Sequence, residues 1–177
     1  MPLTAAAVTS LTVQSAPPKL WAEWLWLHFD GGWHNADGGS AIFPDVKLAF
    51  DQGDYRNRSG TVVEPLAGTG IQVVQHITAR EAFLNETGRT CLDEAHFTFI
   101  VRTKIEGGAA HAGTSAYQCR LAAELLQGLL SNDGSLQVLA QKGIVNPEVL
   151  SAEVVPGEQY QTRMLRVGAD LFYEQVT

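Results

Sequence analysis

The chain has 177 residues, of which 45% are hydrophobic and 18% are charged. This size and composition fit a globular domain with its own core, and they exclude a disordered tail or a disulfide-stapled mini-protein. The 12 basic and 19 acidic residues give a formal charge of -7, which disfavours nucleic acid as a tightly bound partner.

Residues 1–16 carry no charged side chain and are rich in alanine, threonine and serine. The basic and apolar regions of a signal peptide are therefore missing, and we expect a protein that is cytoplasmic when it is made. The most apolar stretch, Leu20 to Phe29, is interrupted by Glu23 and is about half the length that a bilayer crossing needs. We predict an N-terminal arm over 1–16, a single domain over 17–177, and no membrane span.

A helix is predicted from Pro17 onwards, because proline is tolerated in the first turn, where N–H donors lack partners anyway. This helix holds three tryptophans within six residues: Trp21, Trp24 and Trp26. Such an aromatic surplus is typical of protein contacts, so these three are candidate interface residues. The alternative is that the helix is sandwiched inside its own subunit.

Two segments, 30–40 and 51–60, are rich in Asp, Asn and Gly without periodicity, so we predict loops there. Strands are predicted over four segments: Ile42 to Phe50, Thr61 to Leu66, Gly70 to Thr78 and Thr90 to Ile105. In the last of these, Phe97, Phe99 and Val101 alternate with polar residues, which indicates a sheet with one dry face.

Two helices follow. Ser115 and Gln118 have the spacing of a capping box, and Tyr117, Leu121, Leu125 and Leu129 recur every four residues. Ala122, Leu126 and Leu130 flank them, so the helix has a wide apolar stripe. The pattern predicts a helix that lies flat on the sheet and ends at Asn132-Asp133-Gly134. A second, short helix is predicted over Ser135 to Lys142, closed by Gly143.

The end of the chain returns to strands, over Leu150 to Val155 and Gln161 to Glu174. In the second, the side chains expected to face one way are Leu165, Val167, Ala169, Leu171 and Tyr173. Strands, then helices, then strands predict an α+β fold: a mostly antiparallel β-sheet with helices packed on one face. Strict βαβ alternation is absent, which argues against a doubly wound nucleotide-binding fold.

The best metal candidate is the cluster His28, Asp30, His34 and Asp37, since imidazole and carboxylate groups can converge on a divalent cation. However, the spacing matches no known ligand pattern, and both aspartates precede glycines, as turn residues commonly do. Cys91 and Cys119 fit buried thiols rather than exposed nucleophiles. We therefore predict no catalytic, metal or cofactor-binding residue and no cofactor.

Four arginines are further candidate interface residues: Arg56, Arg58, Arg163 and Arg166. Arginine pairs well with carboxylates at interfaces, and the chain has acidic residues in excess. The alternative for each of them is solvated surface charge.

Three segments of the C-terminal half carry a resemblance: the helix that begins Ser115-Ala-Tyr-Gln-Cys-Arg-Leu, the run Leu136-Gln-Val-Leu-Ala-Gln-Lys-Gly-Ile, and the strand Arg163-Met-Leu-Arg-Val-Gly-Ala-Asp-Leu-Phe-Tyr. Together they resemble the tail terminator (tail completion) proteins of long-tailed bacteriophages and related minor tail proteins. The element order matches from about Pro17 to Val176. The N-terminal arm and the loop over 30–40 depart from compact members of the family.

The resemblance implies a virion structural protein without enzymatic activity, assembled in the host cytoplasm. It implies a homohexameric ring that caps the tail tube and joins it to the head-proximal neck or stopper protein. DNA would be only transiting cargo, and no membrane would be involved. Two alternatives stay open: another head-tail neck or adaptor subunit, and a small-molecule or metal-binding domain or hydrolase that uses the loop over 30–40.

Overall fold

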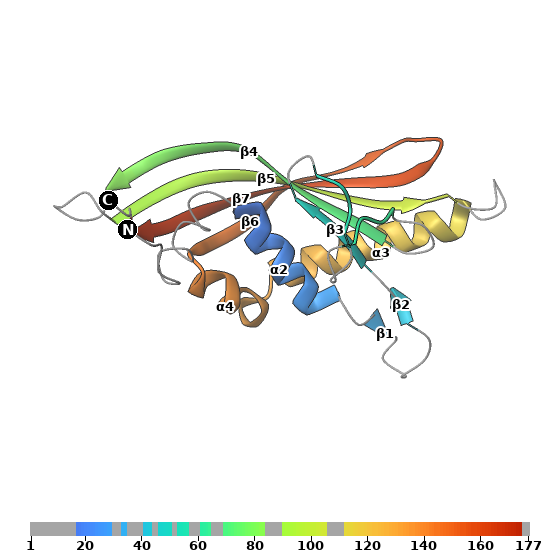
Figure 1. The fold of residues 1–177 in the computed structure, drawn as a ribbon, viewed down its shortest axis with the longest axis horizontal. Helices are drawn as coiled ribbons and strands as arrows, with labels where there is room; N and C mark the ends of the chain where they lie inside the picture. The colour runs from blue at the N-terminus through green and yellow to red at the C-terminus, as the bar shows by residue number, and fades with distance from the viewer. Residues whose placement is uncertain are drawn as a thin grey trace.

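The computed structural model describes residues 17–29, 33–34, 41–43, 46–50, 53–56, 61–64, 69–83, 90–105 and 112–174. In this part of the chain, a five-stranded sheet is covered on one face by helices (Figure 1). The α+β fold with a mostly antiparallel sheet is confirmed. The predicted arm over 1–16 lies outside the described residues.

The helices are α2 (Pro17–Phe29), α3 (Ala112–Leu130) and α4 (Asp133–Gln141). The large sheet contains β3 (Val46–Phe50), β4 (Thr69–Phe83), β5 (Thr90–Lys104), β6 (Ile144–Val155) and β7 (Tyr160–Glu174). A separate two-stranded sheet pairs β1 (Trp33–His34) with β2 (Ala41–Phe43).

The strand order in the large sheet is β3-β4-β5-β7-β6. Only β3 and β4 pair in parallel, and the other three pairs are antiparallel. The pairing of β5 with β7 is regular from Thr90 opposite Glu174 to Lys104 opposite Tyr160. β7 therefore lies between β5 and β6, although it follows both of them in the chain.

The core lies between the sheet and the helices. Alternate side chains of β5 and β7 are buried on the helix side, among them Phe97, Phe99, Val101, Leu165 and Val167. The predicted dry face is confirmed, because these positions share one side of the pleated sheet. The opposite face of the sheet carries no helix in the described structure.

α3 starts earlier than predicted, and its predicted apolar stripe is fully buried along one side. It begins at Ala112, and Ser115 lies within it, where Oγ donates a hydrogen bond to the Lys104 carbonyl at 3.2 Å instead of capping the helix. The residues fully buried against the sheet are mostly small, including Cys119 and Ala122, while Tyr117 is exposed. Ala122, Leu126 and Leu130 of the predicted stripe are buried, whereas Leu121, Leu125 and Leu129 are half-buried on its flank.

The segment Asn132-Asp133-Gly134, which was predicted to end α3, also begins α4. The Asn132 side chain caps it by accepting a hydrogen bond from the Ser135 amide, as an N-cap asparagine does. Gly143 follows the helix with φ of 90°. β6 then starts at Ile144 rather than Leu150, and its pairing shifts register around Pro147 and again before Ser151. A bulge accommodates the proline, which has no N–H for the ladder.

The segments between α2 and β4 are less regular than expected. The predicted strand Ile42 to Phe50 is divided into β2 and β3, and β1 lies inside a segment predicted as loop. The prediction of a strand from Thr61 is wrong for 61–64, where the structure has only an isolated bridge between Val62 and Arg56. No helix in the described ranges is both long and apolar enough to cross a membrane.

Candidate functional site

Two of the three candidate tryptophans lie inside the subunit. Trp21 and Trp24 are 0% and 1% exposed. The Trp21 ring makes edge-to-face contacts with Trp24, Phe97 and Phe99, at centroid distances of 5.6, 5.6 and 5.1 Å. These two side chains join α2 to the sheet, as in the alternative of a sandwiched helix, and they leave at most 1% of their surface exposed.

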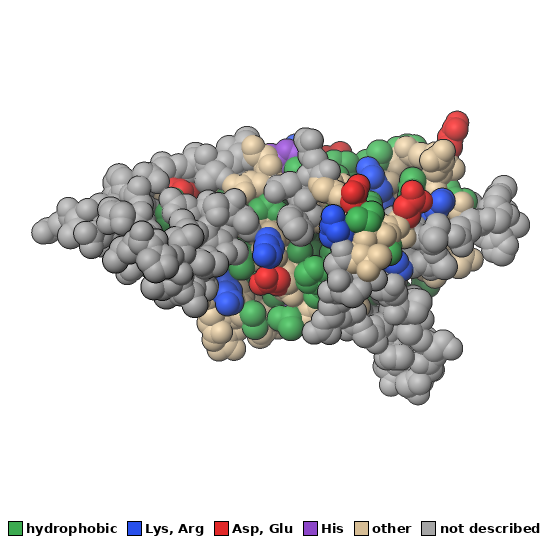
Figure 2. Space-filling view, in the orientation of Figure 1, with side chains coloured by type: hydrophobic (Ala, Val, Ile, Leu, Met, Phe, Trp, Pro, Cys, Tyr) green, Lys and Arg blue, Asp and Glu red, His purple; other side chains and the backbone are tan. Residues whose placement is uncertain are grey.

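The exposed apolar surface of α2 comes from other residues. Leu27 is 61% exposed and Trp26 is half-buried, and Val138 of α4, 39% exposed, lies across from them. Together α2 and α4 form a groove of about 310 Å³. We call this the α2–α4 groove; its residues are Leu20, Glu23, Trp24, Trp26, Leu27, Val138, Leu139 and Lys142. Over these helices, hydrophobic side chains reach the surface among acidic and basic ones (Figure 2).

A second apolar surface lies on β6, the edge strand of the sheet. Leu150 and Val154 are 51% and 62% exposed. Gly168 of β7 leaves room for Leu150, since a Cβ there would lie 3.4 Å from a Leu150 methyl carbon. Glu153 lies between them in sequence, and its carboxylate is 3.9 Å from the Arg166 guanidinium. The register of β6 with β7 places Leu150, Glu153 and Arg166 on the face away from the helices, whereas Val154 lies opposite Arg163 on the other face. We call Leu150, Glu153 and Arg166 the β6 patch.

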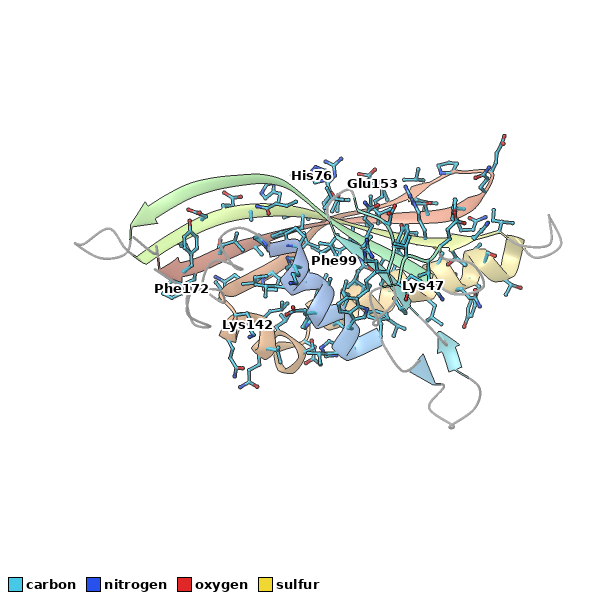
Figure 3. The ribbon with its side chains drawn as sticks, viewed as in Figure 1. Lys47, His76, Phe99, Lys142, Glu153 and Phe172 are labelled. Atoms are coloured by element: carbon cyan, nitrogen blue, oxygen red, sulfur yellow. The ribbon has the colours of Figure 1, made fainter. Side chains whose placement is uncertain are left out.

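The sheet face opposite the helices has a concavity of about 550 Å³. Its lining includes His76, His96, Thr98, Met164 and Arg166, and His76 projects from this face in Figure 3. Glu94 lies 2.9 Å from the His96 imidazole, and Arg166 faces Glu153. Each of these two lining residues thus has an acidic side chain beside it.

The four candidate arginines do not form one cluster. Arg56 is exposed and forms backbone bridges to Leu48 of β3 and to Val62, at one edge of the sheet. Arg163 and Arg166 lie on β7, next to the opposite edge. Arg58 lies outside the described residues. Arg166 alone belongs to an apolar surface, the β6 patch.

The structure describes only part of the candidate metal cluster. His28 packs edge-on against Trp24 at 5.1 Å, and burial lowers the pKa of its imidazole, an effect that a hydrogen bond to the Ser135 backbone opposes. Asp30, Asp37 and the side chain of His34 lie outside the described residues. Among the residues that are described, no group of three His, Cys, Asp or Glu side chains could hold a metal ion.

Cys119 is buried where α3 meets the sheet. Its Sγ donates to the carbonyls of Val101 and Gln161, both at 3.4 Å. Burial raises the pKa of the thiol to about 11. Because the thiolate is the reactive form, Cys119 is a poor nucleophile near neutral pH, as expected for a buried thiol.

The exposed apolar residues of the two surfaces were not singled out from the sequence, although Arg166 of the β6 patch was. Leu27 and Val138 lie on helices far apart in the chain, and no local pattern shows that these helices are neighbours. Leu150 and Val154 lie in a predicted strand, but the sequence does not show that this strand is at the edge of the sheet.

Comparisons with known proteins do not assign the chain to a family. No protein-family model matches it, and a search of curated proteins finds no match. Its surfaces and element order are therefore the basis for a functional proposal.

Proposed function

We propose that the chain is a ring-forming structural subunit of a phage tail, a tail terminator that caps the tail tube and joins it to the neck. One observation carries this proposal: two surfaces built by different elements present exposed large hydrophobic side chains beside charged ones, Leu27 and Val138 at the α2–α4 groove and Leu150 at the β6 patch. A ring uses heterologous contacts, in which two different patches of each subunit meet. Such contacts require two separate patches on each subunit.

The order of elements supports the same proposal. α2 precedes the central strands, α3 and the shorter α4 follow them, and β7 closes the sheet. This is the order that the resemblance to tail terminators implies. Under this proposal the ring is a homohexamer in the virion, assembled in the host cytoplasm. Its partners are the tail tube and the head-proximal stopper protein, and DNA only passes through it.

The first test is native mass spectrometry of the purified protein over a concentration series, with negative-stain imaging of any oligomer. We expect a closed ring, a hexamer, without bound metal or cofactor. A monomer that carries a stoichiometric metal ion or ligand would contradict the proposal and favour a binding domain or hydrolase. Electron microscopy of the protein mixed with its cognate tail tubes then separates a terminator, which binds the tube end, from an adaptor that binds only neck proteins.

A pair of surface variants tests whether the apolar surfaces carry the assembly. Leu27→Asp places a charge in the α2–α4 groove and is expected to weaken self-association at least about tenfold, because a contact would bury that charge without a partner. Tyr117→Asp is the control, since Tyr117 is 55% exposed on α3 and outside both surfaces. Sedimentation velocity measures both, and equal effects of the two variants would argue against the groove.

A further inference from the structure

We infer that the α2–α4 groove of one copy receives the β6 patch of the next copy. This inference rests on the proposed function, because it names the contact from which the ring would be built. The groove has apolar walls from Trp26, Leu27 and Val138, with Glu23 and Lys142 beside them. Its occupant must therefore offer an apolar side chain with charged groups of both signs next to it.

The β6 patch has this composition. Leu150 is a large hydrophobic side chain that is 51% exposed, on the same face of the sheet as Arg166. Near it Glu153 and Arg166 carry one charge of each sign, 51% and 61% exposed. The β6 patch therefore presents the apolar and charged side chains that complement the α2–α4 groove.

The charges on the two surfaces are complementary. Lys142 of the groove would pair with Glu153 of the second copy, and Glu23 with Arg166 of the second copy. Within one chain, Glu153 and Arg166 are separated by 3.9 Å and well exposed, and an exposed pair of this kind is worth little. Both are therefore available to exchange partners, and complementary charges fix the register of the contact.

The positions of the two surfaces favour a head-to-tail contact. The groove lies in the helix layer, whereas β6 and β7 extend as a hairpin to one end of the sheet (Figure 1). Lys142 and Glu153 are labelled on opposite sides of the sheet in Figure 3. A contact between such surfaces leaves one groove and one patch free at the ends of every dimer, and it repeats until a ring closes.

A charge swap tests the pairing directly. Lys142→Glu and Glu153→Lys should each weaken self-association about tenfold, because each places like charges opposite one another. The double variant should restore the association to within about threefold of the original. The control combines Lys142→Glu with Glu124→Lys, an exposed acid on α3 outside the patch, and should show no recovery. Analytical ultracentrifugation gives the association constants, and circular dichroism verifies that each variant is folded.

Cysteine cross-linking tests proximity without relying on charge. Chains with Leu27→Cys and chains with Leu150→Cys are mixed and oxidised, and we expect a disulfide-linked heterodimer. A mixture of Tyr117→Cys with Leu150→Cys is the control and should give none. If rings form but neither this cross-link nor the charge-swap recovery is seen, the docking is overturned and the ring function stands. If the cross-link forms but only open chains or dimers are found, the docking stands and the ring function fails.

Discussion

At the scale of single residues, Trp21 and Trp24 differ mainly in one hydrogen bond. Both are buried, but the Trp24 indole donates to the Ser135 carbonyl at 2.7 Å, whereas the Trp21 indole N–H has no acceptor among the described residues. We expect Trp24→Phe to lower the free energy of unfolding by about 1 kcal/mol more than Trp21→Phe does. Urea denaturation followed by circular dichroism measures both, and a larger loss for Trp21→Phe would contradict the assignment.

Cys119 gives a second residue-level prediction. Its pKa of about 11 leaves almost no thiolate at pH 8, and its burial blocks access to reagents. We expect an alkylating reagent to label Cys119 at pH 8 only when the protein unfolds. Peptide-level mass spectrometry follows this site separately from Cys91, with the urea-unfolded protein as the control. Rapid labelling of Cys119 in the native protein would show that α3 does not pack as described.

At the scale of elements, two glycines are expected to respond oppositely to substitution by alanine. Gly128 lies within α3 with nothing within 4 Å of an added Cβ, so Gly128→Ala should stabilise the protein by about 1 kcal/mol through helix propensity. Gly143 has φ of 90°, where a Cβ is strained, so Gly143→Ala should destabilise it by about 1 kcal/mol or more. Thermal melting compares the two variants, and a shift in the same direction for both would contradict these backbone assignments.

The elements also show how far sequence patterns determine this fold. Strict alternation predicted β5 and β7 well, because one face of each strand is buried and the other is not. The start of β6 was missed since Pro147 argues against a strand, and only pairing with β7 through a bulge accommodates it. The apolar stripe of α3 was predicted, but the repeat of every fourth residue could not show that Ala122 and Leu126 would be more deeply buried than Leu121 and Leu125.

The candidate interface was harder to predict than the fold. The three tryptophans of α2 were predicted to lie at an interface. However, periodicity does not show how much of a helix is covered by the elements packed against it. The sheet and α4 cover Trp21 and Trp24, and Leu27 is left exposed. Which residues remain at the surface depends on contacts between segments distant in the chain, and these contacts are absent from any local pattern.

At the scale of the whole molecule, the helices cover one sheet face and polar groups cover much of the other. On the uncovered face, His96 lies beside Glu94 and the Asn146 amide donates to Asp170 at 2.9 Å. Such a face is ordinary for an antiparallel sheet. The apolar surfaces therefore lie at the helix layer and at the sheet edge.

The position of β7 inside the sheet has a consequence for synthesis on the ribosome. β6 is made before β7, yet in the described sheet β7 is its only neighbour, so β6 has no ladder to join until β7 leaves the exit tunnel. A nascent chain stalled before Tyr160 should be digested by protease, whereas a chain whose β7 has emerged from the tunnel should resist. The edge that carries Leu150 would then form only after β7 has emerged, so a shorter nascent chain could not associate through it prematurely.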